Sequence, residues 1–291
     1  MDSHRQSSGA RSRVIAVVNQ KGGVGKTTTA VNLAASLAAS ERATLLIDLD
    51  PQGNASSAFG CIQPDRQIYD ALLGSASLRE VTCGTELSHL HLAPAAPDLV
   101  GAEVELVTLE DREARLARAL APERDHYNYV LIDCPPSLGF LTLNALVAAD
   151  SVLIPLQCEY YALEGLARLL DTIARVRQTA NPDLAIEGIV FTMFDPRANL
   201  SRQVAEEARN HFAESVFETA IPRNVRLSEA PSHGKPILLY DVRSRGAQAY
   251  LALAKELIAR NENPAPPKTP PPLQASATAP SIGGETYGRT S

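Results

Sequence analysis

Residues 20–28 combine glycines, lysines and threonines at a spacing suited to holding a phosphate. The segment reads Gln-Lys-Gly-Gly-Val-Gly-Lys-Thr-Thr, follows the apolar run 14–18 and opens a helical pattern at 26–39. Such a turn between a strand and a helix directs backbone N–H groups and the positive end of the helix dipole at an anion. Lys26 is expected to reach the β- and γ-phosphates, and the Thr27 hydroxyl is expected to bind Mg²⁺. The sequence therefore predicts a site for a nucleoside triphosphate.

The start of this segment departs from the usual phosphate-binding loop. The common pattern is G-x-x-x-x-G-K-[ST]. Here the first glycine position holds Gln20, and a second lysine, Lys21, follows it. Spacing alone gives Lys21 no role, but this departure from the common pattern carries more information than the match does.

Aspartates end two of the predicted strands, where they could serve a metal-bound triphosphate. Asp48 and Asp50 end one strand, and Asp133 ends another. Asp133 is expected to hold Mg²⁺ through water. Asp50 begins a Pro/Gly/Asn loop and is expected to orient the attacking water and to lie at the metal. Turn or capping chemistry is the alternative for all three, and it is the favoured interpretation for Asp48.

The hydrophobic pattern predicts an α/β fold. We expect strands at 14–18, 43–48, 89–93, 128–133, 151–156, 186–192 and 216–221, and helices at 26–39, 99–120, 139–148, 161–178, 199–212 and 244–260. Several of the strands are continuously apolar, which is typical of a parallel sheet covered on both faces. The alternation of strands and helices predicts a doubly wound, mostly parallel sheet with ligands at the carboxyl ends of its strands.

Composition divides the 291 residues into three parts. We expect residues 1–12 to form a disordered, Ser/Arg-rich leader without the apolar core of a secretory signal. Residues 13–261 carry the α/β pattern. Residues 262–291 hold seven of the 20 prolines, a composition typical of a disordered tail. No run of 18 apolar residues predicts a membrane span. The four cysteines lack C-x-x-C spacing, so we expect buried, reduced thiols.

Five segments together resemble one protein family. Lys21–Thr28 resembles the deviant Walker A motif of the ParA/MinD family of P-loop ATPases, and 48–54 and 133–137 resemble its two switch segments. Residues 157–165 and 221–232 resemble the chromosomal, Soj-type ParA branch. The resemblance covers about residues 13–260, and both tails lie outside it.

The resemblance implies that the whole loop contacts ATP, with Thr28 at the α-phosphate. The residues concerned are Lys21, Gly22, Gly23, Val24, Gly25, Lys26, Thr27 and Thr28. In the family, the signature lysine, here Lys21, crosses to the phosphates of the partner subunit in an ATP-bound homodimer. Together with the phosphate contact of Lys26 and the water-orienting role of Asp50, this role of Lys21 completes the set of expected catalytic residues. Pro222 and Asn224 match the segment that contacts adenine.

The charge distribution favours DNA as the target of such a switch. The net charge is −6, so any nucleic-acid surface must be local. Residues 223–245 carry five basic and two acidic side chains, whereas 64–125 carry six basic and twelve acidic ones. A basic face binds phosphates without reading sequence. The resemblance assigns nonspecific DNA binding to the positions of Arg197 and Arg226.

The expected function is therefore ATP-dependent chromosome partitioning in the cytoplasm, on the nucleoid, with hydrolysis stimulated by a ParB-like partner. One alternative remains open, a DNA-bound regulator that uses ATP only as a dimerisation ligand. A MinD-like membrane target is disfavoured because prolines follow the last predicted helix. Electron transfer through a shared iron–sulfur cluster is disfavoured because Cys134 has no evident partner cysteine.

Overall fold

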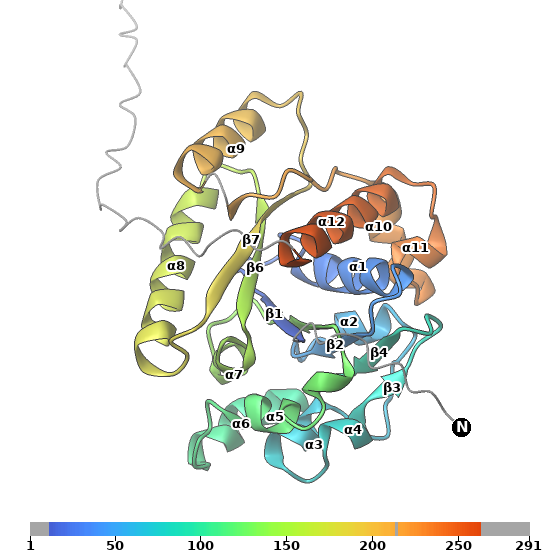
Figure 1. Ribbon diagram of the computed structural model, residues 1–291, viewed down its shortest axis with the longest axis vertical. Helices are drawn as coiled ribbons and strands as arrows, with labels where there is room; N and C mark the ends of the chain where they lie inside the picture. Colours follow the sequence, from blue (N-terminus) through green and yellow to red (C-terminus); the bar gives the residue numbers. More distant parts are fainter. Residues whose placement is uncertain (1–11, 213–214, 263–291) are drawn as a thin grey trace, which may run out of the picture.

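A seven-stranded sheet forms the centre of the computed structural model, which describes residues 12–212 and 215–262 (Figure 1). Its strand order is β3-β4-β2-β5-β1-β6-β7, and only the β3–β4 pair is antiparallel. The strands are β1 (Arg13–Val17), β2 (Thr44–Asp48), β3 (Cys83–Gly84), β4 (Leu90–Ala93), β5 (Tyr129–Asp133), β6 (Ser151–Gln157) and β7 (Ala185–Thr192). The predicted doubly wound, mostly parallel sheet is confirmed.

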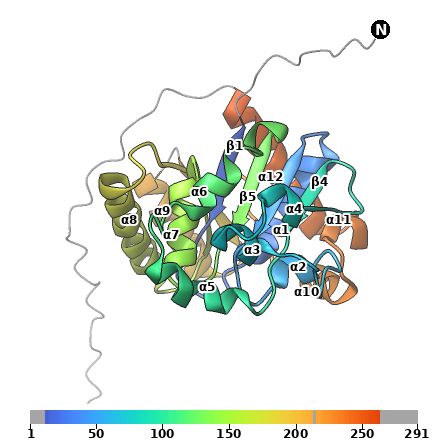
Figure 2. The ribbon, with the colours of Figure 1, turned by 90° about the horizontal axis from the view of Figure 1, so that it is seen from below.

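Helices cover both faces of this sheet, and in Figure 2 α3 to α7 lie in front of it. The α-helices are α1 (Lys26–Ala39), α2 (Asn54–Ser57), α3 (Ile68–Leu73), α4 (Leu78–Val81), α5 (Leu99–Glu105), α6 (Arg115–Leu120), α7 (Phe140–Ala148), α8 (Ala162–Thr179), α9 (Asn199–Phe212), α10 (Val225–Glu229), α11 (Ile237–Tyr240) and α12 (Arg245–Glu262). Short 3₁₀ helices are η1 (Leu106–Thr108), η2 (Arg124–His126) and η4 (Ala230–His233).

The continuously apolar strands contribute side chains to two hydrophobic cores, one on each face of the sheet. Successive residues of a strand point to opposite faces of the sheet. In β1, Val14 and Ala16 pack with the α3–α9 side, whereas Ile15 and Val17 pack with α1, α2 and α12. Burial on both faces explains why these strands lack the apolar–polar alternation of a half-exposed sheet.

Parallel register brings the predicted site residues to one edge. Val17 pairs with Asp133 across β1 and β5, and Asp48 pairs with Asp133 across β2 and β5. The loop after β1 therefore starts beside both aspartates. This arrangement follows the rule that ligands bind at the carboxyl ends of parallel strands.

Two predicted elements are wrong. The helix predicted at 99–120 breaks into α5, η1 and α6, because Leu109 is extended (ψ 144°) and Asp111 is left-handed (φ 51°), and a continuous helix can contain neither conformation. The segment predicted as a strand at 216–221 meets β7 only at its two ends, through a bridge between Val216 and Ile189 and a bond from the Ile221 amide to the Phe191 carbonyl (2.8 Å). There the amides of Glu218 and Thr219 donate to the Glu256 carboxylate of α12 (2.8 and 3.0 Å) instead of a neighbouring strand.

The cysteine prediction holds for two of the four side chains. Cys134 and Cys158 are buried, but Cys61 is half-buried and Cys83 is exposed on the short edge strand β3. Except for Ser12 and Glu262, the predicted leader and tail lie outside the described residues. None of the helices in 12–212 and 215–262 combines the length and apolar character needed to cross a bilayer.

Candidate nucleotide site

The loop between β1 and α1 has the backbone of an anion cradle. Gly23 and Gly25 have positive φ values (75° and 87°), which L-residues with side chains rarely adopt. Gly25 is the N-cap of the 14-residue helix α1, and no described side chain hydrogen-bonds to the helix start. The first N–H groups of α1 thus remain available to a phosphate, together with the positive end of the helix dipole.

Neighbouring strands hold this loop in place. The Thr192 hydroxyl, at the end of β7, donates to the carbonyl of Val24 (2.7 Å). Asn19 donates to the carbonyl of Pro155 in β6 (2.8 Å) and accepts from the amide of Lys21 (3.0 Å). Sequence patterns do not reveal the roles of Thr192 and Asn19. The available signal is their position at the carboxyl ends of buried strands.

Lys26 is buried with its ammonium group pointed into the loop. Its Nζ donates to the carbonyl of Lys21 (3.2 Å). Burial lowers the pKa of Lys26, and the nearby carboxylates of Asp133 and Asp50 oppose that shift. A cation with a single neutral partner is well suited to bind phosphate oxygens.

Asp133 is fully buried, and neither of its carboxylate oxygens has a hydrogen-bond partner among residues 12–212 and 215–262. Burial raises the pKa of this carboxyl well above its ordinary value, and Asp48 adds to the rise; the Thr27 hydroxyl is near enough to oppose it. A carboxylate in such a place needs a cation. The site therefore fits Mg²⁺ between Thr27 and Asp133. The described residues contain no cluster of three or more His, Cys, Asp or Glu that could hold a metal, and Mg²⁺ commonly takes most of its ligands from phosphate and water.

Asp48 anchors the chain after β2. One of its oxygens accepts from the Ser56 amide and hydroxyl (2.8 and 2.7 Å), and the other accepts from the Asp50 amide (3.1 Å). Burial raises the pKa of Asp48 to about 6, and the bonds from Ser56 oppose the rise. The favoured interpretation of Asp48, turn and capping chemistry, agrees with these contacts.

Asp50 lies at the start of the loop that Asp48 anchors. It is buried, accepts from the Gln52 amide (3.0 Å) and lies near enough to Lys26 to affect its pKa. The structure thus brings Lys26, Asp50 and Asp133 together at one edge of the sheet. It also leaves Asp50 an oxygen with no hydrogen bond from the described side chains.

Lys21 lies on the surface and pairs with Glu159. The two side chains are 45% and 46% exposed, and Glu159 also accepts from the side-chain amide of Gln157 (2.5 Å). The role of Glu159 is visible only in the folded chain, because 138 residues separate it from Lys21.

The two residues that are predicted to contact adenine, Pro222 and Asn224, lie between α9 and α10. Pro222 bridges to Phe194, and the side chain of Asn224 accepts from the Arg226 amide (2.9 Å) as the N-cap of α10. A cavity of about 240 Å³ opens beside Thr28, between α1, α2 and η4. Its walls include neither Pro222 nor Asn224; Asn32, Asn54, Ser57 and Lys235 contribute polar atoms to it.

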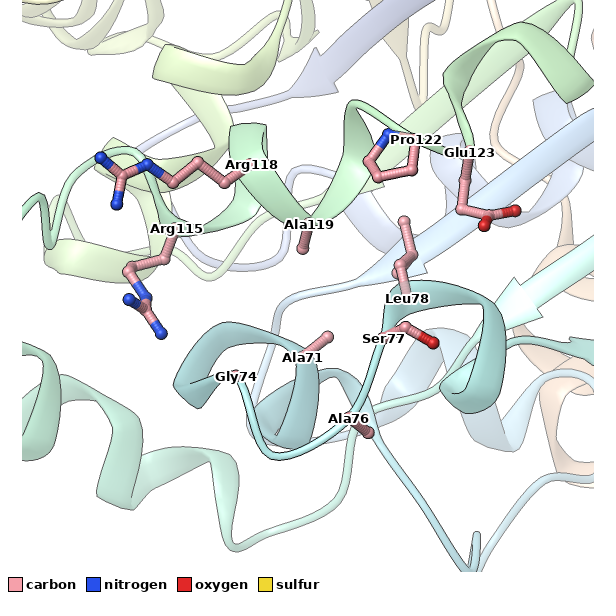
Figure 3. Close-up of a pocket in the computed structure, with 10 residues that line it drawn as sticks. All are labelled: Ala71, Gly74, Ala76, Ser77, Leu78, Arg115, Arg118, Ala119, Pro122 and Glu123. Carbon is pink, nitrogen blue, oxygen red and sulfur yellow. The ribbon is translucent and has the colours of Figure 1, made fainter.

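A second cavity of about 270 Å³ lies between α3, α4 and α6 (Figure 3). Its walls contain none of the predicted site residues. Arg115 donates to the carbonyl of Leu72 (2.8 Å), and Arg118 pairs with Asp111. Both arginines of this cavity therefore have partners among the described residues.

Both predicted DNA-binding arginines are paired within the chain. Arg197 is 89% exposed and makes two bonds of 3.0 Å to Asp195. Arg226 pairs with Glu229 (2.8 Å) and lies 3.7 Å from Asp241. Exposed pairs of this kind contribute about 0–1 kcal/mol and are easily exchanged for other anions.

A left-handed glycine loop, a buried lysine and an unpaired aspartate at the edge of a parallel sheet define a P-loop nucleotide-binding protein. The AAA_31 family, described as an AAA domain, matches residues 12–186. The chain is 60% identical over 260 residues to the chromosome partitioning protein ParA of Myxococcus xanthus, covering 89% of this chain and 90% of that protein.

Two further proteins are similar to this chain over most of their length. The sporulation initiation inhibitor protein Soj of Bacillus subtilis is 56% identical over 249 residues, covering 85% of this chain and 98% of that protein. A structure described as cobyrinic acid a,c-diamide synthase from Mycobacterium smegmatis, with bound ADP and magnesium, is 39% identical with a TM-score of 0.75 and covers 87% of this chain and 96% of that one. The chain belongs to the ParA/Soj family of P-loop ATPases, and its Myxococcus xanthus relative is named for chromosome partitioning.

Proposed function

We propose that this chain is an ATP-driven switch that dimerises, binds DNA without sequence preference and is reset by a ParB-like protein, so that it partitions chromosomes on the nucleoid in the cytoplasm. ATP and Mg²⁺ are the cofactors of this proposal. The observation that carries it is the buried, unpartnered Asp133 carboxylate beside Thr27 and Lys26. The structure of a 39% identical protein with bound ADP and magnesium supports the choice of ligand.

The residues around the phosphates have distinct tasks in this proposal. Thr27 and Asp133 hold Mg²⁺, which when bound neutralises charge on the phosphate oxygens. Lys26 balances charge on the same oxygens from the side of the loop. Asp50 accepts a proton or hydrogen bond from the attacking water, and Asp48 keeps Asp50 in place through the loop that it anchors.

Dimerisation depends on Lys21. The Lys21–Glu159 pair must open before Lys21 can reach the phosphates of another subunit, and an exposed pair costs little to open. Two exposed tyrosines, Tyr160 and Tyr161, follow Glu159 directly. Exposed aromatic side chains are enriched in protein interfaces, so their position beside Lys21 supports a contact between subunits here.

DNA binding uses a patch that includes Arg197 and Arg226. Both arginines can exchange their surface carboxylates for phosphates, because each pair is solvent-exposed. The Arg226→Glu variant should release DNA while the ATP dimer persists. Arg66→Glu, in the acidic part of the chain, is the matched control, because Arg66 is also exposed and paired with a glutamate. Equal DNA retention at 50 and 300 mM salt would contradict an electrostatic patch.

A regulator that binds ATP without turning it over is the alternative to this switch. The two functions separate in an assay of ATP hydrolysis with DNA and a ParB protein present. We expect Asp50→Ala to bind ATP and to lose stimulated hydrolysis, whereas an unchanged rate would exclude the water-orienting role. We expect Lys21→Ala to lose both hydrolysis and the ATP dimer. A dimer of this variant in light scattering would contradict the crossing lysine.

A further inference from the structure

An apolar surface is exposed on α5 and the residues that follow it. In the described parts of the chain, ten large hydrophobic side chains are exposed, and four of them belong to this region. Val100, Val104 and Val107 are 59%, 72% and 48% exposed, and Leu138, in the loop before α7, is 44% exposed. Spacings of four and three residues place the three valines on one helical face, which is called the α5 stripe below.

The α5 helix is bonded to the loop that begins at Asp133. The Glu103 carboxylate accepts from the first amides of α7, those of Phe140 (3.0 Å) and Leu141 (3.3 Å). A Cβ atom at Gly139 would lie 2.3 Å from this carboxylate, so only glycine allows the approach. A displacement of α5 would therefore move the start of α7 and the loop that joins it to Asp133.

The surroundings of the α5 stripe are acidic. Residues 98–113 contain six carboxylates and one basic residue, Arg112, which is paired with Glu113. A symmetric contact with a second copy would bring this acidic surface against itself, and like charges across an interface are costly. A partner with apolar side chains at helical spacing and a basic flank fits the stripe and its rim.

We propose that the α5 stripe, with Leu138, docks a basic amphipathic segment of the protein that stimulates ATP hydrolysis. The proposal rests on the proposed function, since it locates the partner's contact with the switch. Docking buries the three valines, and Glu103 passes the displacement of α5 to α7 and to the loop after Asp133. The stimulating signal then reaches the phosphate site from the α5 side of the sheet.

The test uses the full chain with Mg-ATP, DNA and a fluorescent N-terminal peptide of a ParB protein from the same organism. Val104→Glu should raise the peptide concentration needed for half-maximal stimulation at least 10-fold and leave the basal rate unchanged. Glu110→Lys, at the acidic rim, should raise this concentration several-fold at low salt. Ile62→Glu is the matched control, because Ile62 is equally exposed (75%) on another part of the surface; it should behave as the wild type.

The outcomes separate this surface from the function on which it rests. Failure of the peptide to bind or stimulate the wild type would overturn both proposals. Stimulation of wild type and Val104→Glu at the same peptide concentration would overturn only the docking surface. Loss of the ATP dimer in Val104→Glu without peptide would make the stripe an interface between copies and would also overturn the proposal. Val104→Ser, which adds no charge, should show the same loss of peptide affinity if Val104→Glu fails to fold.

Discussion

Ser56→Ala should destabilise the protein far more than the loss of one surface hydroxyl would. The Ser56 hydroxyl donates to Asp48 (2.7 Å) and accepts from the Ala95 amide (2.9 Å), and all three groups are buried. A hydrogen bond to a charged group contributes about 1.5–3 kcal/mol, and an unsatisfied buried amide costs about 1–3 kcal/mol. We therefore expect the free energy of unfolding to fall by about 4 kcal/mol at pH 8.

The fall in the free energy of unfolding caused by Ser56→Ala should be larger at high pH than at low pH. The pKa of Asp48 is raised to about 6 from an ordinary 3.8, so its burial costs stability progressively as the pH rises through that interval. Removal of the Ser56 hydroxyl raises this pKa further and extends the cost to higher pH. Near pH 4.5 Asp48 is protonated in both folded proteins. The difference between variant and wild type should then shrink to about 2 kcal/mol, roughly the penalty of the unpaired Ala95 amide.

Urea denaturation followed by circular dichroism at pH 4.5 and pH 8 measures both quantities. The adjacent Ser57→Ala is the matched control, because the Ser57 hydroxyl makes only an exposed bond to the Asn54 carbonyl (3.1 Å); it should change stability by less than about 0.5 kcal/mol. A loss under about 1 kcal/mol at pH 8 for Ser56→Ala, or the same loss at both pH values, would refute the anchoring role of Asp48.

Three further predictions concern packing, metal binding and the surface lysine pair. Gly246→Ala places a Cβ 2.7 Å from Leu227 and should cost about 1–3 kcal/mol in urea denaturation, whereas Gly165→Ala, in open space on α8, should be neutral or stabilising. Asp133→Asn should keep its stability without nucleotide, since it replaces a buried carboxyl that has no hydrogen-bond partner among the described residues, but lose most of the Mg²⁺-dependent thermal shift with ATP; an unchanged shift would exclude Asp133 from the metal site. Glu159→Gln removes an ion pair with Lys21 that contributes at most about 1 kcal/mol. In light scattering the dimer of this variant should therefore form at the same ATP concentration as the wild type or at a concentration up to about fivefold lower. If the variant needs more ATP, the Lys21–Glu159 pair does not oppose dimerisation.

Local sequence patterns identified the nucleotide loop well, because its chemistry is contiguous. Glycines with positive φ, a lysine and a threonine lie within eight residues, between a buried strand and a helix. The strands 14–18 and 128–133 were predictable for a similar reason, since burial on both faces leaves a continuous apolar run. Asp133 was predicted as a site residue from its position at the end of such a run, and register places it beside the loop that follows β1.

Secondary-structure elements whose ends or partners are not marked by hydrophobic periodicity were harder to predict. The pattern over 99–120 is apolar enough for one helix, yet the left-handed Asp111 divides it. The segment 216–221 has the composition of a strand, but two of its central amides bond to a carboxylate of α12, 37 and 38 residues further along the chain. Hydrophobic periodicity cannot report a partner that is so distant in sequence.

The sequence by itself determined the class of site, because the groups that bind phosphate are encoded in one short segment whose backbone freedom and charge are local properties. Only the tertiary structure decided what each remaining group does. It paired Lys21 with Glu159, bonded Asp48 to Ser56, left Asp133 without a partner and joined α5 to α7 through Glu103. The physical reason is that burial and hydrogen-bond partners depend on which strands and helices become neighbours, and residues far apart in the chain supply them.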